Sequence, residues 1–377
     1  MNIYFDNAAT TPLDPDVFEA MKPFFLQDFG NPSSTHAHGR KARAAIESGR
    51  KTVAALLNCT PGEIIFTSGG TEAINCILAG AVKAYTPSAI ITSRVEHHAV
   101  LHTAEQLNTH AKIEYVNLDD RGNVDLDHLQ QLLRENHGAL VSLMQANNEI
   151  GNLLDIHHVG ELCAAAGAYF HSDTVQAVGH YRHDLKHTPV HGITAAAHKF
   201  HGPKGVGFMY VKRDKKIGPY IFGGGQERNN RGGTENVAGI IGLCKALEIA
   251  YSNLDDHTAY IRNLKSRMIA RLKEGIPDVS FNGNSEDLDK SLYTILNVSL
   301  PESDENDMLL FNLDLIGISA SGGSACSSGA STGSHVLQAL NPDEQRGAIR
   351  FSFSKFNTIE EVDFVVDKLT ERFSVIG

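Results

Sequence analysis

The feature that most constrains the fold of this chain is a regular alternation of short apolar runs and longer amphipathic segments. Apolar runs of strand length lie at 63–68, 89–93, 112–116, 139–145, 168–173, 192–197 and 205–211. Helical patterns separate them at 71–84, 98–107, 125–136 and 157–167, with further helices expected at 41–57 and about 236–251. This alternation predicts an α/β domain with a mostly parallel sheet flanked by helices. Loops at the carboxyl ends of the strands are then expected to form the functional site.

The sequence changes character after Tyr251. A charged helical stretch is followed by short strand-like runs at 278–282, 293–300 and 347–354, and by helical patterns at 305–315 and 358–373. This order is typical of an α+β domain. A chain of 377 residues is long enough for two domains. We therefore expect a large domain at 15–255 and a smaller α+β domain built from 1–14 and 256–377.

Composition excludes several functional classes. The formal net charge of −11 argues against nucleic acid as the main partner, because phosphate binding needs a basic surface. The sequence contains no apolar run of membrane-spanning length, and we expect a cytoplasmic protein without a signal peptide. The five cysteines form no CxxC pair, so a disulfide framework or a zinc site is not expected. Four of them lie in apolar or helical surroundings and are interpreted as small core residues.

The segment from Tyr169 to Gly205 offers an acid, an amide and a lysine to a ring-shaped cofactor. Asp173 ends an apolar run, Gln176 follows it, and Lys199 closes the next apolar run before a turn rich in glycine and proline. A lysine at the end of a buried strand is well placed to form a Schiff base. The alternative is an ordinary surface lysine.

The sequence FTSGGTEA predicts a strand, a tight glycine turn and then a helix. Backbone N–H groups around Gly69, Gly70 and Thr71 would form an anion-binding cup at the helix N-terminus. The stretch lacks both the lysine of a P-loop and the spacing of a dinucleotide-binding motif. A plain strand-to-helix turn remains the alternative.

The sequence SRVEHHAVLH brings together Glu96, His97, His98 and His102. Their spacing does not match that of a zincin helix, so a metal site is disfavoured. An imidazole that stacks on a planar ring is the preferred functional interpretation, and surface histidines are the alternative.

Further polar residues follow or interrupt apolar strands. Asn147, Asn148 and Glu149 come directly after a buried strand, where unpartnered side chains would be costly. Arg350 lies inside an apolar strand and is expected to need a carboxylate partner. Cys326 differs from the other cysteines because it lies in SASGGSACSSGAS, a segment with the composition of a mobile loop that presents a thiol.

A last candidate is the glycine-rich segment FGGGQERNNRGGTEN, which contains Arg228 and Arg231. Its composition suits a backbone that closely approaches an anion or a neighbouring subunit. A flexible surface loop is the alternative interpretation.

Together these motifs resemble the cysteine desulfurases of the NifS/IscS type, which are pyridoxal-phosphate enzymes of aminotransferase fold type I. The matching motifs are DNAATTP, GNPSS, FTSGGTEA, EHHAV, NNEIG, HSDTVQAVG, HKFHGPKG, GGGQERNNRGGTEN, SGGSACSS and IRFS, in the family's order. The resemblance implies a large domain with a mainly parallel seven-stranded sheet and a small α+β domain that carries the catalytic cysteine. It also implies a homodimer.

The resemblance implies roles for individual positions. Lys199 would bind the cofactor as a Schiff base, His97 would stack over its ring, and Cys326 would be the catalytic nucleophile. The implied cofactor ligands are Gly70, Thr71, His97, Asn148, Asp173, Gln176, His198, Lys199 and Thr234, the last reaching the site from the second subunit. The implied substrate ligands are Asn31, Asn148 and Arg350.

The implied reaction converts L-cysteine to L-alanine and leaves a persulfide on Cys326. An iron–sulfur scaffold protein or another sulfur carrier would accept this sulfur, and nucleic acid would be involved only indirectly, through partners in tRNA thiolation. No permanent metal ligand is expected, although Cys326 is a candidate for transient binding of an iron–sulfur cluster through its persulfide.

Three positions depart from the pattern of the family. Ala196 replaces a serine that commonly contacts the phosphate, Thr174 replaces an alanine behind the ring, and Lys355 replaces a frequent arginine. Competing functions on the same fold are a selenocysteine or cysteine-sulfinate lyase and an ordinary aminotransferase. A non-catalytic scaffold that keeps the fold is the alternative from a different functional class.

Overall fold

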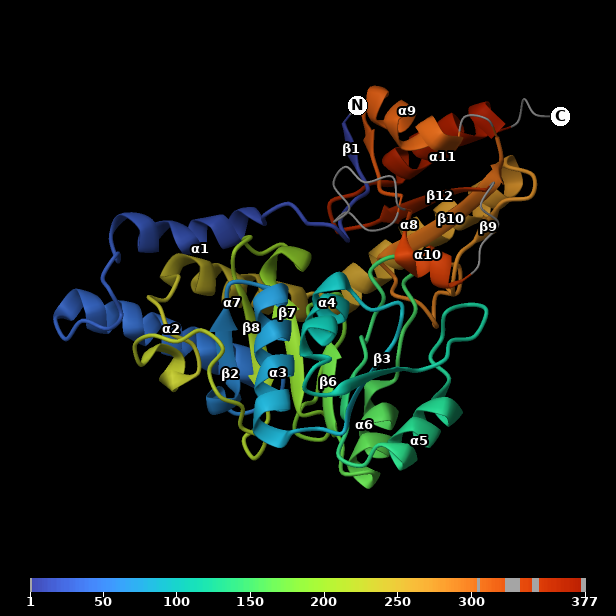
Figure 1. Ribbon diagram of the computed structural model, residues 1–377. Coiled ribbons are helices and arrows are strands. Elements are labelled where there is room, and N and C mark those ends of the chain that lie inside the picture. Colours follow the sequence, from blue (N-terminus) through green and yellow to red (C-terminus); the bar gives the residue numbers. More distant parts are fainter. Residues whose placement is uncertain (1, 304–305, 323–332, 341–345, 374–377) are drawn as a thin grey trace.

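The computed structural model describes residues 2–303, 306–322, 333–340 and 346–373. Cys326 lies outside the described residues. The chain forms a large α/β unit and a smaller α+β unit, which lies at the upper right in Figure 1.

The large unit is built on a seven-stranded sheet with the strand order β2-β8-β7-β6-β5-β3-β4. Its strands are β2 (Ile64–Thr67), β3 (Ala89–Thr92), β4 (Lys112–Tyr115), β5 (Leu140–Ser142), β6 (Tyr169–Asp173), β7 (Gly192–Ala196) and β8 (Gly207–Val211). The pairs among β3, β4, β5, β6 and β7 are parallel, whereas β8 runs antiparallel to both β7 and β2. The mainly parallel sheet expected from the sequence is confirmed.

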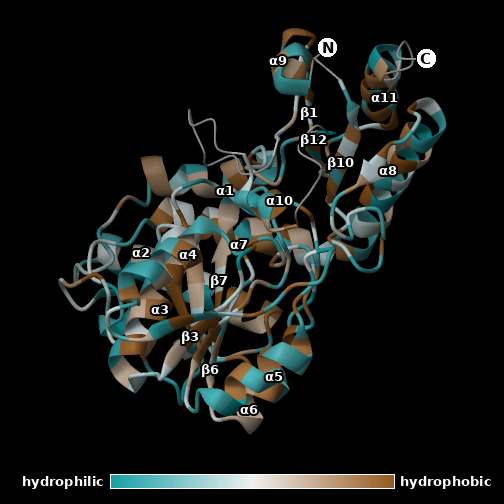
Figure 2. Cartoon of the chain, turned by 45° about the vertical axis from the view of Figure 1, so that its right-hand side comes forward, coloured by the Kyte–Doolittle hydropathy of each residue, from teal (hydrophilic) through white to brown (hydrophobic). Residues whose placement is uncertain are grey.

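Helices cover both faces of this sheet because its central strands are buried on both sides. One face packs against α3 (Gly70–Tyr85) and α4 (His98–Leu107), through residues such as Ile90 and Leu140. The other face, through the neighbouring residues Ile91 and Val141, packs against a second set of helices. That set comprises α1 (Pro15–Leu26), α2 (Ala37–Leu56), α5 (Leu126–Glu135), α6 (Ile156–Ala165) and α7 (Val237–Ser252). Figure 2 shows the hydrophobic colouring concentrated on the central strands.

The small unit follows a sharp bend. The axes of α7 and α8 (Leu254–Gly275) differ by 75°. A three-stranded antiparallel sheet has the order β12-β10-β9 and packs with α8 and α11 around a separate core. Its elements are β9 (Ser280–Phe281), β10 (Ile295–Glu302), α9 (Leu309–Leu315), β11 (Ile318–Ser319), α10 (His335–Ala339), β12 (Arg346–Ser352) and α11 (Ile359–Phe373).

The N-terminal segment lies with the small unit. Strand β1 (Ile3–Tyr4) pairs in parallel with β11, and Phe5 and Ala8 belong to the core of the small unit. The chain then crosses to α1, which packs against α7 of the large unit (Figure 1). The division into 15–255 and 1–14 with 256–377 stays a prediction.

The structure differs from the expected elements in three places. Helix α2 begins at Ala37, earlier than the expected 41, because His36 caps it by accepting a hydrogen bond from the Gly39 N–H group. The run at 278–282 forms only the two-residue strand β9. Helix α10 was not expected from the sequence, and Ser334 caps it by accepting from the Leu337 N–H group.

None of the helices in the described parts of the chain is, alone, long and apolar enough to cross a membrane.

Candidate active site

A cavity of about 220 Å³ opens where the sheet meets the small unit. Its walls contain residues that the sequence had placed in seven separate motifs. These lining residues include Gly70, Thr71, His97, Asn148, Asp173, Gln176, His198, Lys199 and Arg350. The fold therefore brings together most of the predicted site.

Lys199 ends a short 3₁₀ turn that follows β7 (Ala197–Lys199). Its Nζ donates hydrogen bonds to the carbonyl oxygens of Ala8 and Ala9, the latter at 2.9 Å. Gln176 Nε2 donates to the same Ala8 oxygen at 2.9 Å. The N-terminal DNAATTP turn thus contacts Lys199. The sequence motif by itself does not indicate this contact.

Asp173 ends β6 and is 5% exposed. Its Oδ1 accepts hydrogen bonds from the Val175 N–H group at 2.9 Å and from Thr194 Oγ1 at 3.2 Å. Burial raises the pKa of this carboxyl group, even though Lys199 and the two hydrogen bonds oppose the shift. A cationic ring nitrogen beside Asp173 would favour its ionised form.

The N-terminus of α3 lies where the sequence predicts an anion-binding cup. Gly69 has φ of 155°, a conformation that side chains of L-residues rarely adopt. A Cβ atom on Gly70 would lie 2.8 Å from Val175 Cγ2. The turn therefore approaches β6 and β8 closely, and the unpaired N–H groups of the first helical turn are available to an anion. His198 and Thr71 line the same cavity.

His97 caps α4, with its Nδ1 accepting from the Ala99 N–H group at 3.0 Å. Burial, with a further contribution from Lys199, lowers the pKa of His97 to about 4. The imidazole is thus neutral at physiological pH and suits stacking on a planar ring. His98 packs against the rings of His102 and His335, with centroids 5.0 and 4.3 Å away. Among the described residues no cluster of three or more His, Cys, Asp or Glu side chains has the geometry to hold a metal ion.

Arg350 lies in β12 and is 1% exposed. Its Nη2 donates to Asp6 Oδ1 at 2.7 Å, and its Nη1 donates to the Asn148 carbonyl oxygen at 2.8 Å. The expected carboxylate partner is therefore present. The sequence reasoning did not name Asp6, although the residue opens the DNAATTP motif.

Two predicted ligands lie outside the cavity. Asn31 is exposed, and its Oδ1 accepts from the Ser33 N–H group at 2.9 Å. Thr234 is exposed in the glycine-rich loop and lines a different hollow, together with Arg231. Their proposed roles stay predictions.

Within the residues that the structure describes, four ion pairs hold the glycine-rich loop to the rest of the large unit, and two of them use both carboxylate oxygens of a glutamate. Arg50 donates to both carboxylate oxygens of Glu227, at 2.7 and 2.8 Å, and both side chains are buried. Arg231 forms a comparable pair with Glu72 on α3. Glu227 has a positive φ of 44°, and its neighbours Arg228 and Asn229 also have positive φ angles. Such left-handed conformations are unfavourable for these residues, so the buried ion pair of Arg50 and Glu227 stabilises a strained backbone. This anchoring contradicts a freely flexible surface loop.

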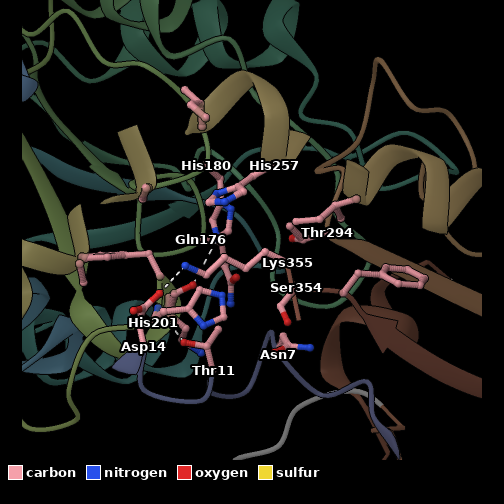
Figure 3. A pocket seen from close by; sticks show the side chains of 18 of the residues that line it. Asn7, Thr11, Asp14, Gln176, His180, His201, His257, Thr294, Ser354 and Lys355 are labelled. Atoms are coloured by element: carbon pink, nitrogen blue, oxygen red, sulfur yellow. Dashed lines mark hydrogen bonds and ion pairs between the residues drawn. The ribbon is translucent and has the colours of Figure 1, made fainter. Parts of the chain in front are cut away.

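A second cavity of about 30 Å³ lies behind Lys199, between the two units (Figure 3). His180 Nδ1 and Tyr293 Oη are 3.0 Å apart, and His180 Nε2 lies 3.2 Å from the Lys199 carbonyl oxygen. Lys355 forms an ion pair with Asp14, the N-cap of α1. Lys355, which replaces an arginine that is frequent in the family, therefore connects the small unit to α1.

Thr174 and Ala196 are the other two residues that depart from the family pattern. Thr174 is buried, and its Oγ1 donates to the Thr194 carbonyl oxygen at 2.7 Å. Ala196 lines the main cavity and offers no hydrogen bond there. The extra hydroxyl of Thr174 is thus satisfied within the protein.

The cavity fits pyridoxal phosphate by the chemistry of its walls. The α3 N-terminus suits the phosphate, Asp173 suits the ring nitrogen, and Gln176 suits the phenolic oxygen. Lys199 lines the same cavity and offers an amine for a Schiff base. A side chain at position 70 would collide with Val175, so the turn keeps its place against the cavity wall only as glycine. Arg350, which lines the same cavity, suits the carboxylate of an amino acid.

Known proteins share this sequence and fold. A family model described as aminotransferase class-V matches residues 3–365. The cysteine desulfurase IscS of Clostridium botulinum strain Hall is 42% identical over 372 residues, covering 97% of this chain and 93% of the relative. The cysteine desulfurase IscS of Dictyoglomus turgidum is 43% identical over 374 residues, with coverages of 97% and 93%.

Solved structures agree with these relatives. A NifS-like protein has a TM-score of 0.91 at 38% identity, and the match covers 100% of both chains. An apo cysteine desulfurase from Thermococcus onnurineus NA1 has a TM-score of 0.88 at 26% identity, covering 100% of this chain and 95% of the other.

Proposed function

The chain belongs to the class-V aminotransferase family and is a pyridoxal-phosphate-dependent cysteine desulfurase, and on this premise we propose the roles of its residues. Lys199 carries the cofactor, Arg350 receives the substrate carboxylate, and Cys326 accepts the sulfur. The supporting observation is that one cavity holds a lysine, an anion cup, a buried acid and an arginine. These groups complement the charges of a cofactor and an amino acid bound side by side.

The protein groups divide the chemistry between them. Pyridoxal phosphate, when bound, supplies an electron-withdrawing ring. Asp173 would hold a proton on the nitrogen of this ring, and the neutral His97 would pack against the ring. Lys199 Nζ is then the group placed to move the proton of the substrate Cα atom. Arg350 and Asn148 orient the substrate through its carboxylate.

The remaining step needs a thiolate, and the surroundings of the described cysteines support Cys326 for it. Burial raises the pKa of Cys59, Cys76, Cys163 and Cys244 to about 12 in each case. These thiols stay protonated at neutral pH and are poor nucleophiles. In the proposed step a sulfur–sulfur bond forms at Cys326 as the Cβ–S bond of cysteine breaks. The carbon takes a proton, and the products are alanine and the Cys326 persulfide.

We also propose a homodimer. Helix α1 and the residues after it expose Phe18, Phe25, Leu26 and Phe29, with exposed fractions of 50% to 68%. Phe222 in the glycine-rich loop is 75% exposed. A second copy of the chain would cover such apolar side chains and bring Thr234 to the cofactor phosphate of its partner.

The acceptor of the persulfide is proposed as an iron–sulfur scaffold protein or another sulfur carrier. The support is the similarity to relatives that are named IscS. The cytoplasmic location stays a prediction.

Substitution of the nucleophile tests the proposed reaction. We expect Cys326→Ser to lower alanine formation from cysteine by on the order of 10²-fold or more, because a serine hydroxyl is not ionised at neutral pH. The absorbance of the bound cofactor should not change. Cys59→Ser is the matched control and should keep its activity, since the Cys59 thiol stays protonated.

A Cys326→Ser variant that forms alanine and sulfide at the wild-type rate would exclude the persulfide step. That result would favour a lyase of the selenocysteine or cysteine-sulfinate type. Pyruvate in place of alanine would point to an aminotransferase.

A further inference from the structure

Arg350, the proposed ligand of the substrate carboxylate, already pairs with a carboxylate of the protein. The guanidinium of Arg350 is buried in β12 and is bound to Asp6 at 2.7 Å and to the Asn148 carbonyl oxygen at 2.8 Å. In the described part of the chain, Arg350 lines the main cavity and Asp6 does not. Asp6 thus contacts the guanidinium from outside the space that a ligand would occupy.

The hydrogen bonds of Arg350 are incomplete. A guanidinium carries five N–H donors, and Nε of Arg350 is buried without an acceptor among the described residues. Nε is closed off from the cavity, whereas Nη1 and Nη2 each donate one of these hydrogen bonds and carry a second N–H group. Because Arg350 lines the cavity, a ligand carboxylate can bind these second N–H groups without displacing Asp6. A ligand carboxylate and Asp6 would share the same positive charge.

The backbone of Asp6 is fixed beside Arg350. Its carbonyl oxygen accepts hydrogen bonds from Tyr4 Oη at 3.1 Å and from the Ala9 N–H group at 3.0 Å. A backbone bridge to Ser352 fixes it beside the strand that carries Arg350. The two carboxylates would therefore compete for Arg350 throughout the reaction.

This competition matters because substrate and product carry the same α-carboxylate. Arg350 would bind that carboxylate equally in cysteine and in alanine. Tight binding would therefore slow the release of alanine without lowering the activation barrier of the reaction. We propose that Asp6 is a positioning residue that weakens the hold of Arg350 on the α-carboxylate and so allows alanine to leave. This inference rests on the proposed role of Arg350.

The test measures carboxylate binding to the holoenzyme by calorimetry, with propionate as the probe. Propionate has the carboxylate but no amine, so it cannot react with the cofactor. In Asp6→Asn a ligand carboxylate becomes the sole anionic partner of a buried arginine, and we expect the Kd of propionate to fall about tenfold. The KM for cysteine and the inhibition constant of alanine should fall in parallel. Asp6→Glu keeps the charge and should bind propionate like the wild type.

The matched control is Asp363→Asn, which removes an aspartate from Arg267 and Arg271 on the small unit, away from the cavity. It should leave the Kd of propionate unchanged. Weaker or unchanged binding in Asp6→Asn would overturn the inference, because a purely structural role predicts loss of affinity. If Asp6→Asn does not yield holoenzyme, Asp6→Ser serves the same comparison.

The proposed function fails in a different way. If Arg350→Lys binds propionate as tightly as the wild type does, Arg350 is not the carboxylate site. If Arg350→Lys weakens binding and Asp6→Asn does not strengthen it, the role of Asp6 alone is wrong.

Discussion

At the scale of single residues, burial sets the charge of many titratable groups in and around the site. It lowers the pKa of His97 and of His198 to about 4, in each case with a smaller contribution from Lys199. It raises the pKa of Glu96, which directly precedes His97, to about 8. The pocket is thus lined by neutral imidazoles, and the buried carboxyl group of Glu96 next to His97 is uncharged at neutral pH. Such surroundings suit an aromatic ring better than a solvated ion.

Lys265 is a buried titratable group outside the site. The side chain is 0% exposed in α8, and its Nζ donates to Ser291 Oγ at 2.8 Å and to the Leu292 carbonyl oxygen at 3.2 Å. Burial lowers its pKa from 10.5 to about 7. Between these two values the unfolded chain binds a proton that the folded protein does not, so stability rises with pH across this window.

We expect Lys265→Met to remove this rise. The lysine alone contributes a slope of up to about 1.4 kcal/mol per pH unit between its folded and unfolded pKa values. Urea unfolding at pH 7 and pH 10 measures the difference. Lys273→Met, on the exposed side of the same helix, is the control and should keep the wild-type slope. An unchanged slope in Lys265→Met would show that Lys265 is charged in the folded protein.

At the scale of elements, the anion cup depends on how closely three segments approach each other. A Cβ atom on Gly207 of β8 would lie 2.4 Å from the Ala195 carbonyl oxygen and 2.8 Å from Gly69 Cα. Both neighbours are backbone atoms, which cannot move aside as a side chain can. β7, β8 and the turn before α3 can therefore pack this closely only because residue 207 is a glycine.

Gly207→Ala is accordingly expected to separate β8 from the Gly69 turn. The free energy of unfolding should fall by about 1–3 kcal/mol, as for other overpacked sites, and the cofactor should bind more weakly. Denaturant unfolding and cofactor titration measure the two effects. At Gly218 a Cβ atom meets nothing within 4 Å, so Gly218→Ala should change stability by less than about 0.5 kcal/mol. Equal effects of the two variants would contradict this account.

At the scale of the whole molecule, buried histidines dominate the expected response to acid. Burial is the main cause of a low pKa, about 3 or 4, at seven positions, namely His97, His171, His180, His183, His191, His198 and His201. Between these values and the ordinary value of 6.5 the unfolded chain binds more protons than the folded protein. Stability therefore rises with pH through this window and is lost as pH falls.

Three buried carboxyl groups oppose this trend. The pKa values of Glu96, Glu149 and Asp173 are raised, so the folded protein keeps protons that the unfolded chain releases. The histidines outnumber them, and we expect stability to increase from about pH 4.5 to 6.5. Denaturant unfolding at pH 5.0 and 6.5 checks this, and added salt should not abolish it because burial is the cause. A stability that falls over this range would contradict the buried, neutral state of the histidines.

Sequence reasoning recovered the elements whose patterns are locally complete. The parallel sheet follows from the alternation of apolar runs, and Lys199 and Asp173 were found because each ends such a run. Their meeting in one cavity was expected because carboxyl ends of parallel strands share an edge. Helix α10 was missed because five residues carry little periodicity.

Other contacts were out of reach because they join distant segments. Nothing local in DNAATTP shows that its carbonyl groups meet Lys199 or that Asp6 pairs with Arg350. The pair of Arg50 and Glu227 is similar, since the residues are separated by 177 positions. Arg350 did give a signal, because a buried guanidinium needs an acid, but the sequence does not say which acid.

The position of the N-terminal strand has a consequence for biosynthesis. Tyr4 and its neighbours are synthesised before the large sheet, yet β1 pairs with β11, and Asp6 meets a partner that is 344 residues later. Contacts of such long range form late because closing a long loop is slow. A nascent chain can assemble the large sheet before residues 3–6 have met their partners in β11 and β12. The cavity wall that contains Arg350 is therefore completed only after β12 has been synthesised, so a chain that stops before β12 lacks this wall.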